Sequence, residues 1–388
     1  MANIAILLQE YFPADVRVRK EVHALCEEGH QIDIFCLRGS DELAFETAGN
    51  VIIHRTLLSK KRGSKLRYIT EYFIFFIRAY FWLRRLVSKN RVDVVHVHTL
   101  PDFLVFAVHF AKKKGAKVIL DMHEITPEFF MSKYNITEKN IIIQILKWIE
   151  RKSMEYADFV ITVNKQIKDK FSKRAKVKNE IVVIMNTVDD IEFPRIPKKE
   201  HKKIIGVYHG TLTELYNLDF AINALKLIED KLSNFEFHIY GSGTQLEKLK
   251  ELVSMLGLMH IVFLHGRVNH TEIPEILSQA DIGILPLRKD IMTDLSFSNK
   301  IAEYIHYSIP VLSSNLKGIS EYFPENSVFY FRHNDIQDFN TNLLRIISEK
   351  DLRNEYAGRA SAIYKTMGWD IMKARLKDLV LGIEKGNN

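Results

Sequence analysis

The sequence predicts an α/β protein with two domains, each built on a parallel β-sheet. Three observations support this prediction. Short apolar runs rich in valine and isoleucine alternate with amphipathic helical stretches along the chain. These runs do not alternate cleanly between apolar and polar residues, which is typical of strands covered on both faces. The length of 388 residues and the 47% hydrophobic content suffice for two separate cores.

The first half contains six predicted strands with helices between them. The strand Asn3–Gln9 precedes a helix from Arg17 to Glu28, which Gly29 ends. The later strands have the sequences QIDIFCL, VDVVHVHT, KVILDMHE, FVITVN and IVVIMN. The segment FPRIPKKEHKK contains two prolines and a charge cluster, which indicates a linker. We therefore place the first domain at residues 1–195.

The second half repeats this pattern over residues 196–368. Its predicted strands are KIIGVYHG, FEFHIYG, IVFLHG, IGILPL and VLSSN. The predicted helices are Leu218–Glu229, Leu246–Met255, Ile273–Ala280 and one that begins at Asn299. Residues 369–388 form a separate C-terminal helix. Both halves are thus Rossmann-like βα repeats, whose ligands bind at the carboxyl ends of the strands, and two such domains that face each other would line a cleft.

Glycines follow three predicted strands of the second domain. They occur in the sequences His209-Gly210-Thr211, Gly241-Ser242-Gly243 and His265-Gly266-Arg267. A glycine at a strand end lets the backbone come close to a phosphate or a sugar. Ordinary βα turns also favour glycine, and these sequences do not form a G-x-G-x-x-G fingerprint. The glycines alone therefore leave a binding edge and a set of plain turns open.

The helix that begins near Asn299 has two unusual features. Lys300 lies in its first turn, where the helix dipole disfavours a cation. Glu303 lies one turn inside, and neither Ser298 nor Asn299 as the cap places it at the third position that a capping box requires. An anionic ligand at the helix start explains both features. A solvated lysine with a surface glutamate is the alternative.

The net charge of +7 is concentrated in residues 60–91, which carry +9 and leave −2 for the rest. Charges interrupt this segment too often for a transmembrane helix. Helical spacing predicts a core-facing stripe of Leu66, Ile69, Phe73, Phe76, Tyr80, Leu83 and Val87. The other aromatic residues, with their basic neighbours, suit an anionic membrane surface. A core helix and a membrane-contacting helix both stay open, whereas no nucleic-acid-binding motif accompanies the charge.

The rest of the composition argues against several kinds of site. Cys26 and Cys36 are too few for a disulfide framework or a four-cysteine zinc site, which favours structural thiols in a reducing compartment. The N-terminal sequence MANIAILLQEYFP lacks the features of a signal peptide. No Asp-x-Asp occurs in the chain, so a metal-bridged diphosphate has no obvious ligands. We expect a cytoplasmic protein and no metal site.

The sequence NKIAEYIHYSIPVLSSN resembles the signature of the group 1 (family 4) retaining glycosyltransferases, which have the GT-B fold. The segments ADFVITVN, IVVIMNTVDDIEF, FHIYGSG, IVFLHGRV and ADIGILPL resemble successive parts of that family in the same order. Trp369 resembles the tryptophan that precedes a C-terminal helix crossing back to the first domain. The resemblance covers nearly the whole chain.

The resemblance implies a nucleotide-diphosphate sugar as the donor, with UDP or GDP as the nucleotide, and no further cofactor. Glu303 would bind the ribose hydroxyls, Lys300 with the helix start would hold the diphosphate, and His98 would lie near the donor sugar and the acceptor. The implied catalytic residues are His98, Lys300 and Glu303. The implied donor-binding residues are Gly210, Thr211, Gly241, Gly243, Arg267, Val268, Ser298, Asn299, Lys300, Ile301 and Glu303.

The sequence departs from the family pattern at three places. Leu295, beside Asp294, occupies the position of a first family glutamate. The loop HGTLTELYN offers Thr211 and Tyr216 where many members have an arginine and a lysine. The usual paired glycines after the first strand are replaced by EYFPADVRVRK, from which Arg17 or Arg19 could supply the lost positive charge.

We therefore expect a metal-independent, retaining transferase of the hexosyltransferase type. Positively charged groups of the protein beside the departing diphosphate would stabilise its negative charge and so favour the reaction. The basic segment suggests a lipid-linked or polysaccharide-precursor acceptor and a peripheral position on the inner face of the cell membrane. A nucleotide-sugar epimerase or hydrolase on the same fold, and a non-catalytic nucleotide-sugar binding protein, are the alternatives.

Overall fold

The computed structural model describes residues 1–58, 65–199 and 201–386. The chain divides into two compact units, one comprising Met1–Asn186 with Asp370–Asn388 and the other comprising Thr187–Trp369. The second unit therefore begins earlier than the residue 196 that we expected. The reason is that the proline-rich segment packs on that unit, where Tyr307 Oη donates a 2.7 Å hydrogen bond to the carbonyl of Pro194.

The first unit contains an eight-stranded sheet in the order β3-β4-β2-β1-β5-β6-β7-β8. Its strands are β1 (Asn3–Tyr11), β2 (Gln31–Leu37), β3 (Phe45–Ala48), β4 (Val51–Thr56), β5 (Val94–His98), β6 (Lys117–Met122), β7 (Phe159–Thr162) and β8 (Val182–Val183). The strands pair in parallel except for the hairpin β3–β4. We did not predict this hairpin, because the FETA sequence of β3 is exposed throughout and carries no apolar pattern.

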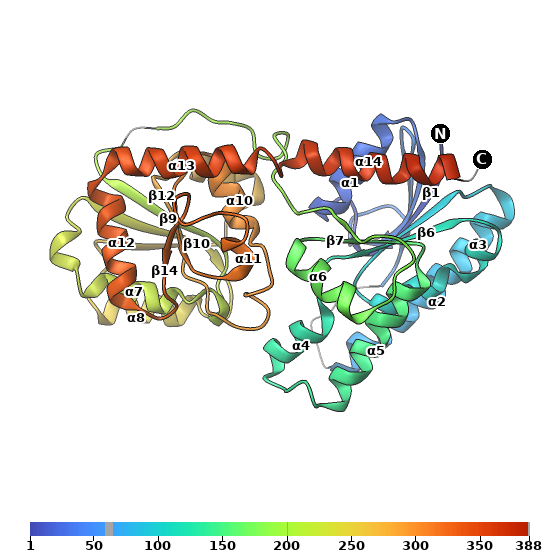
Figure 1. The fold of residues 1–388 in the computed structure, drawn as a ribbon, viewed down its shortest axis with the longest axis horizontal. Helices are drawn as coiled ribbons and strands as arrows, with labels where there is room; N and C mark the ends of the chain where they lie inside the picture. Colours follow the sequence, from blue (N-terminus) through green and yellow to red (C-terminus); the bar gives the residue numbers. More distant parts are fainter. Residues whose placement is uncertain (59–64, 200, 387–388) are drawn as a thin grey trace. The chain divides into compact units, whose positions relative to one another are not determined.

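Helices cover both faces of this sheet (Figure 1). They are α1 (Val16–Glu27), α2 (Lys65–Lys89), the 3₁₀ helix η1 (Asp102–Val108), α3 (His109–Lys113), α4 (Thr126–Tyr134), α5 (Ile141–Tyr156), α6 (Lys165–Arg174) and α14 (Trp369–Gly386). Helix α14 belongs to the first unit, as the predicted crossing of the C-terminal helix requires. Lys377 of α14 pairs with Glu27 at 3.0 Å, and the backbone N–H of Met185 lies 3.2 Å from the sulfur of Met372.

Helix α2 buries a face that matches the predicted stripe only in part. Leu83 is 1% exposed, as predicted, but Phe75, outside the stripe, is 0% exposed, whereas the predicted core residues Ile69 and Phe73 are 67% and 58% exposed. The side chain of Leu66 lies outside the described residues. The prediction was wrong for Ile69 and Phe73 because two apolar stripes run along this helix, and its own periodicity does not show which stripe meets the sheet. The exposed apolar residues follow one another at four-residue intervals: Ile69, Phe73, Ile77 and Phe81. Of the helices within the described residues, none is both long and apolar enough to cross a bilayer.

The second unit contains a six-stranded parallel sheet in the order β11-β10-β9-β12-β13-β14. Its strands are β9 (Ile204–Thr211), β10 (Phe235–Ser242), β11 (Val262–Gly266), β12 (Ile282–Leu285), β13 (Val311–Ser314) and β14 (Phe329–Phe331). Its α-helices are α7 (Leu218–Lys226), α8 (Leu246–Met255), α9 (Ile273–Ser278), α10 (Asn299–His306), α11 (Lys317–Ser320), α12 (Ile336–Ser348) and α13 (Lys350–Tyr364). The five strands that we predicted in this half are present, and β14 adds a sixth.

Candidate functional site

The carboxyl ends of β9 and β10 lie side by side and are built from glycine. Gly210 pairs with Gly241, and Thr211 pairs with Ser242. Gly241 has φ +153°, and a Cβ on it would lie 1.8 Å from the carbonyl oxygen of Gly210. A side chain cannot fit there unless the strands separate. The two backbones therefore meet without side chains between them, which leaves an open edge above the sheet.

This edge forms one wall of a pocket of about 430 Å³. The pocket is lined by His209, Gly210, Thr211, Tyr240, Gly241, Ser242, Arg267, Val268, His270, Ile273, Asn299, Lys300 and Glu303. These residues come from the ends of β9 and β10, the segment after β11, the start of α9 and the first turns of α10. The pocket is therefore large enough for a small polar ligand and offers it backbone, cationic and carboxylate groups.

Helix α10 points its N-terminus at this pocket. Ser298 is the N-cap residue, and its side chain makes no capping hydrogen bond. Lys300 Nζ lies 4.1 Å from the ring centroid of Tyr216 and 5.5 Å from that of Tyr208. A Cβ on Gly210 would lie 2.6 Å from Lys300 Cε, so the lysine folds back against the end of β9. The pocket thus contains a cation and an uncapped helix start, which together suit an anionic group.

Glu303 lies one turn further along α10 and contacts a histidine that the sequence analysis did not select. Nε2 of His209 lies 3.0 Å from Glu303 Oε2, and the His209 ring packs edge-on against Tyr304. His209 is 5% exposed and lies beside the carboxylate on the side of the sheet, although its Nε2 makes no well-aligned hydrogen bond within the described residues. Its place directly before Gly210, at the end of a strand, was the signal that could have identified it.

Most of the predicted donor-binding residues line this pocket, and three do not. Ile301 is 0% exposed and belongs to the core of the unit. Gly243 lies just outside the lining, where a Cβ would come within 2.2 Å of the Leu212 carbonyl oxygen. Ser298 precedes the lining residues of α10 as its N-cap. Four lining residues were absent from the predicted set in addition to His209: Tyr240, Ser242, His270 and Ile273.

The structure also locates two of the departures from the family pattern. The Asp294 carboxylate accepts a 3.1 Å hydrogen bond from the backbone N–H of Lys317, and its carbonyl accepts another from Gly318. Asp294 therefore holds the start of α11 and is not among the residues that line the pocket. Tyr216 lies beneath Lys300. An aromatic ring thus packs against the side chain of Lys300.

The first unit contains a second polar cluster, in which charged groups are buried. Arg17 donates hydrogen bonds to both oxygens of Asp121, with Nη2 3.0 Å from Oδ1 and Nε 3.0 Å from Oδ2. The same guanidinium reaches the carbonyl of Ile184 at 2.8 Å. Glu21 lies 3.1 Å from Arg17 Nε. Arg17 therefore does not supply free positive charge to a pocket, which corrects that expectation for Arg17.

Burial sets the protonation of this cluster. Burial would raise the pKa of Asp121, but Arg17 and the neighbouring histidines bring that pKa well below its ordinary value. Burial raises the pKa of Glu21 well above its ordinary value, because the attraction of Arg17 does not compensate for it. Burial also lowers the pKa of His96 and of His98. The cluster therefore combines an anionic Asp121 with a neutral Glu21 and two neutral histidines.

The structure does not place His98 on a surface that a ligand can reach. His98 is 0% exposed, and its Nδ1 lies 3.1 Å from Nε2 of His123. The His123 side chain is 17% exposed and lines a pocket of about 220 Å³ with Leu8, Gln9, Glu10, Asp15, Tyr72, Thr99, Leu100 and Glu124. Of these two histidines, His123, on the adjacent strand end, is therefore the one that lines a pocket of the first unit. The sequence DMHE at the end of its strand was the missed signal.

The same cluster contains four groups of the kind that bind metal ions. Donor atoms of Glu21, His96, His98 and Asp121 all lie within 4.8 Å of one another. However, the Arg17 guanidinium already occupies both oxygens of Asp121 and supplies the positive charge that a metal ion would bring. We therefore assign the cluster to an internal ion pair.

Two family models match successive parts of this chain. Residues 14–192 match the model described as Glycosyltransferase Family 4, and residues 189–362 match the model described as Glycosyl transferases group 1. A 2-deoxystreptamine N-acetyl-D-glucosaminyltransferase from Niallia circulans is 20% identical over 64% of this chain and 65% of its own length. A glycogen synthase from Mycobacterium tuberculosis is 24% identical over 63% of this chain and 58% of its own length. The matches thus span slightly less than two thirds of these relatives.

Solved structures show the same fold over nearly the whole chain. A sucrose-phosphate synthase from Thermosynechococcus elongatus superposes with a TM-score of 0.74 at 13% identity and covers 100% of both chains. HepE from Anabaena in complex with UDP superposes with a TM-score of 0.71 at 12% identity, over 98% of this chain and 100% of that chain. WaaG, a glycosyltransferase involved in lipopolysaccharide biosynthesis, gives 0.71 at 14% identity over the same shares. On this evidence the chain belongs to the group 1 glycosyltransferases of family 4 and has the GT-B fold.

Proposed function

We propose that this glycosyltransferase moves a hexose from a nucleotide-diphosphate sugar to an acceptor hydroxyl, with retention of the anomeric configuration and without a metal ion. One observation carries the proposal: the glycine strand ends, Lys300, the start of α10 and Glu303 all line one pocket. A diphosphate needs cations and N–H donors, and ribose hydroxyls need a carboxylate acceptor. The pocket offers these groups from neighbouring elements of one unit.

The chemistry follows from the charge that develops on the leaving group. As the bond to the sugar breaks, negative charge accumulates on the diphosphate, and fixed positive groups lower the energy of that state. Lys300 and the N–H groups of α10 supply this stabilisation in the proposal. HepE has been solved with UDP and with UDP-glucose, which supports a uridine nucleotide as the first donor to test.

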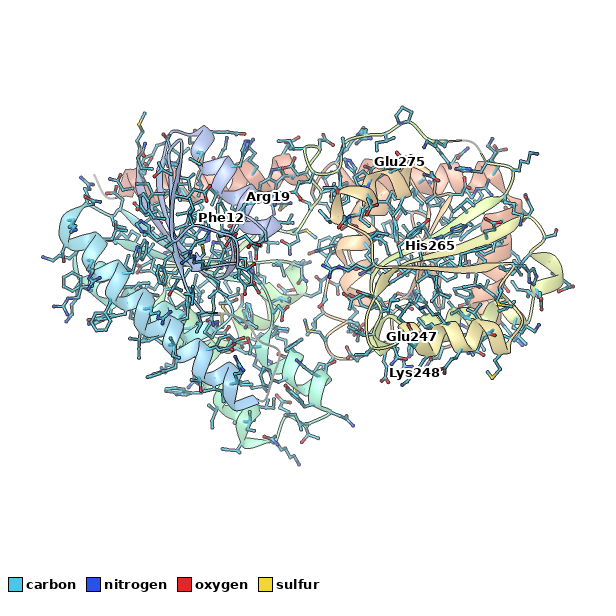
Figure 2. The ribbon with its side chains drawn as sticks, turned by 180° about the vertical axis from the view of Figure 1, so that it is seen from behind. Phe12, Arg19, Glu247, Lys248, His265 and Glu275 are labelled. Atoms are coloured by element: carbon cyan, nitrogen blue, oxygen red, sulfur yellow. The ribbon has the colours of Figure 1, made fainter. Side chains whose placement is uncertain are left out.

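Donor binding separates this proposal from a protein with no nucleotide-sugar site. UDP, GDP and their sugars are added to the protein, and the change in melting temperature is measured, because a ligand that binds the folded state stabilises it. We expect stabilisation in wild type and a loss of most of it in Glu303→Gln. Glu247→Gln is the matched control, since Glu247 is exposed on α8 beside Lys248 (Figure 2). Absence of any nucleotide shift in wild type would refute the proposal.

Product analysis separates transfer from the alternatives. A transferase releases nucleoside diphosphate at a rate that depends on the acceptor, and the product keeps the anomeric configuration of the donor. An epimerase or hydrolase consumes the donor without an acceptor, and a binding protein consumes none. Turnover that is equal with and without acceptor would establish the hydrolase alternative. An inverted product would overturn retention alone.

We further propose that the acceptor is lipid-linked or a polysaccharide precursor and that the protein contacts the inner face of the cell membrane through α2. The exposed stripe Ile69, Phe73, Ile77 and Phe81 has the arginines Arg78, Arg84 and Arg85 beside it, which suits an anionic bilayer surface. Lys60, Lys61 and Arg62 lie outside the described residues, so the apolar stripe is the sharper test.

Flotation with lipid vesicles tests the membrane contact. Wild type is expected to float with vesicles of phosphatidylcholine and phosphatidylglycerol, and Phe73→Ser/Phe81→Ser is expected to stay at the bottom. Leu227→Ser/Met255→Ser is the matched control, because these side chains are 67% and 76% exposed on the second unit. Equal flotation of the two double variants, or none in wild type, would refute the contact.

A further inference from the structure

His123 shares a small group of polar atoms with two buried side chains. Its Nε2 lies 3.1 Å from Nδ1 of His98 and 3.4 Å from Oδ2 of Asp121. His98 Nδ1 in turn lies 3.5 Å from the same Asp121 oxygen. His98 and Asp121 are both 0% exposed. One nitrogen of the His123 ring therefore faces the interior, while the residue itself lines the pocket of the first unit.

Asp121 is held in one orientation as a carboxylate. Arg17 bonds to both of its oxygens, and the guanidinium is fixed from the other side by the carbonyl of Ile184 and by Oδ1 of Asn186, each at 2.8 Å. Arg17 is itself 7% exposed. A buried carboxylate with such a partner remains anionic and cannot rotate away. Its Oδ2 is therefore a fixed acceptor beside the inner nitrogen of His123.

We propose that Asp121 and His98 are positioning residues that hold His123 as the Nε2–H tautomer. The proton on Nε2 points at two acceptors, His98 Nδ1 and Asp121 Oδ2. In this tautomer the lone pair of the ring is on Nδ1, the nitrogen that does not face His98 and Asp121. The backbone adds a further restraint, because the N–H of His123 donates a 3.1 Å hydrogen bond to Thr99 Oγ1. His98 must then carry its own proton on Nε2, which lies 3.9 Å from Glu21 and makes no hydrogen bond within the described residues.

This arrangement selects the ligand chemistry of the pocket. An Nδ1 lone pair accepts a hydrogen bond, so it binds a hydroxyl group rather than a second acceptor. The pocket also contains Glu10 and Glu124, whose carboxylates likewise accept hydrogen bonds from hydroxyls. The polyhydroxylated face of a sugar is the matching ligand class. This step of the argument rests on the proposed transfer function, whereas the tautomer of His123 does not.

Nitrogen NMR on histidine-labelled protein without substrate measures the tautomer directly. His123→Gln assigns the signals of His123. We expect wild-type His123 to carry its proton on Nε2, and His98 to do the same. His98→Leu removes the nearest acceptor and is expected to give a mixture of tautomers at His123, while His98→Asn keeps a polar group near the Nδ1 position and is expected to restore most of the Nε2–H form.

His96→Asn is the matched control for damage to the cluster. His96 lies two residues away on the same strand, is 1% exposed and packs its ring 4.2 Å from that of His98. It is not a hydrogen-bond partner of His123 within the described residues. We expect the His123 tautomer to be unchanged in this variant. An Nδ1–H tautomer in wild type, or an equal change in the His96 and His98 variants, would refute the proposal.

Kinetics test the consequence for transfer. His98→Leu is expected to lower kcat by roughly 10-fold to 100-fold with a smaller change in the KM of the donor, and His98→Asn is expected to recover part of that loss. If wild-type His123 is the Nε2–H tautomer but kcat is unchanged in His98→Leu, the effect on catalysis is refuted and the tautomer assignment is retained. Metal analysis of the purified protein tests whether a metal ion, instead of hydrogen bonds, holds the histidines. A stoichiometric divalent ion bound to them would overturn the proposal.

Discussion

The two polar sites of the molecule are built in opposite ways. The pocket of the second unit exposes glycine backbone, one helix start, one lysine and one glutamate at the edge of a sheet. The cluster of the first unit buries Arg17, Glu21, His96, His98 and Asp121 and exposes only part of His123. The first arrangement needs little to hold it in place, whereas the second is stable only while every buried charge keeps its partner. The two sites should therefore respond differently to substitution.

Removal of the buried cation should have the largest effect on stability. Arg17→Met leaves the Asp121 carboxylate buried without its partner, which typically costs about 3–5 kcal/mol of the free energy of unfolding. Arg19→Met is the matched control on the same helix, where the side chain bonds to the carbonyl of Pro13 at the exposed surface (Figure 2). Urea unfolding followed by tryptophan fluorescence measures both, because Trp82 and Trp148 lie in the first unit. Equal losses in the two variants would contradict the contrast.

Removal of the half-buried cation Lys300 should act on binding rather than on folding. Lys300→Ala takes away a charge-assisted contact with the diphosphate, which is expected to weaken nucleotide binding by about 1.5–3 kcal/mol, or roughly 10-fold to 100-fold. The melting temperature without ligand should change little. Lys248→Ala, on the exposed surface of α8, is the control. Calorimetric titration with UDP and GDP measures the difference, and a shift no larger than that of the control would argue against Lys300 as the diphosphate cation.

The glycine edge should tolerate no side chain. Gly241→Ala places a Cβ 1.8 Å from the Gly210 carbonyl oxygen and should cost about 1–3 kcal/mol more than the same substitution at a glycine with positive φ in open space. Gly257→Ala provides that comparison, because Gly257 has φ +70° and nothing lies within 4 Å of the added Cβ. Chemical unfolding gives both values. Similar losses would mean that backbone strain alone, rather than the contact between β9 and β10, requires glycine.

The smallest expected effect is a change in pH dependence. The folded protein keeps His96 neutral, because burial lowers its pKa well below 6.5, whereas the unfolded chain binds a proton there. Stability is therefore lost as the pH falls below about 6.5, by at most about 1.4 kcal/mol per pH unit from this group. Glu21, Asp121 and His98 face the same ring. Asp121 stays anionic because its pKa is well below the ordinary value, whereas the raised pKa of Glu21 changes stability with pH in the direction opposite to His96. His96→Asn should flatten the slope between pH 7 and pH 5, and an unchanged slope would contradict a buried neutral His96.

Local features of the sequence predicted the second-unit pocket well. Gly210 and Gly241 follow strands, and the Lys300–Glu303 spacing is set within one helix, so each can be identified from nearby residues. The sequence analysis did not select His209, because its contact with Glu303 joins two residues that are distant in the sequence. The sequence around His98 likewise did not show that its side chain is buried. The sequence DMHE places His123 at a strand end, but which of the two histidines reaches the surface also depends on which strands pair and on where α1 places Arg17.

Surface assignment failed where one element carried two plausible patterns. Residues of α2 offered two apolar stripes, and the choice between Phe73 and Phe75 as the core residue depends on how the helix sits on its sheet. Burial of Phe75 and exposure of Phe73 resolve that choice. The hairpin β3–β4 is the converse case, because β4 alternates between buried and partly exposed residues but β3 has no buried residue to mark it.

The return of α14 to the first unit makes the second unit, Thr187–Trp369, an insertion in the connectivity of the first. The chain passes between the units twice, so one cut cannot release an intact first unit. A fragment that ends at Asn186 would lack Met372, Leu376, Val380 and Ile383, which are all at most 3% exposed. The N-terminal amino group lies 3.3 Å from Glu384, so a short linker from α14 to Met1 would turn the first unit into one continuous segment. A circular permutant with this linker, whose new ends lie between Asn186 and Thr187, would keep each unit as one continuous segment, so that either unit could be isolated.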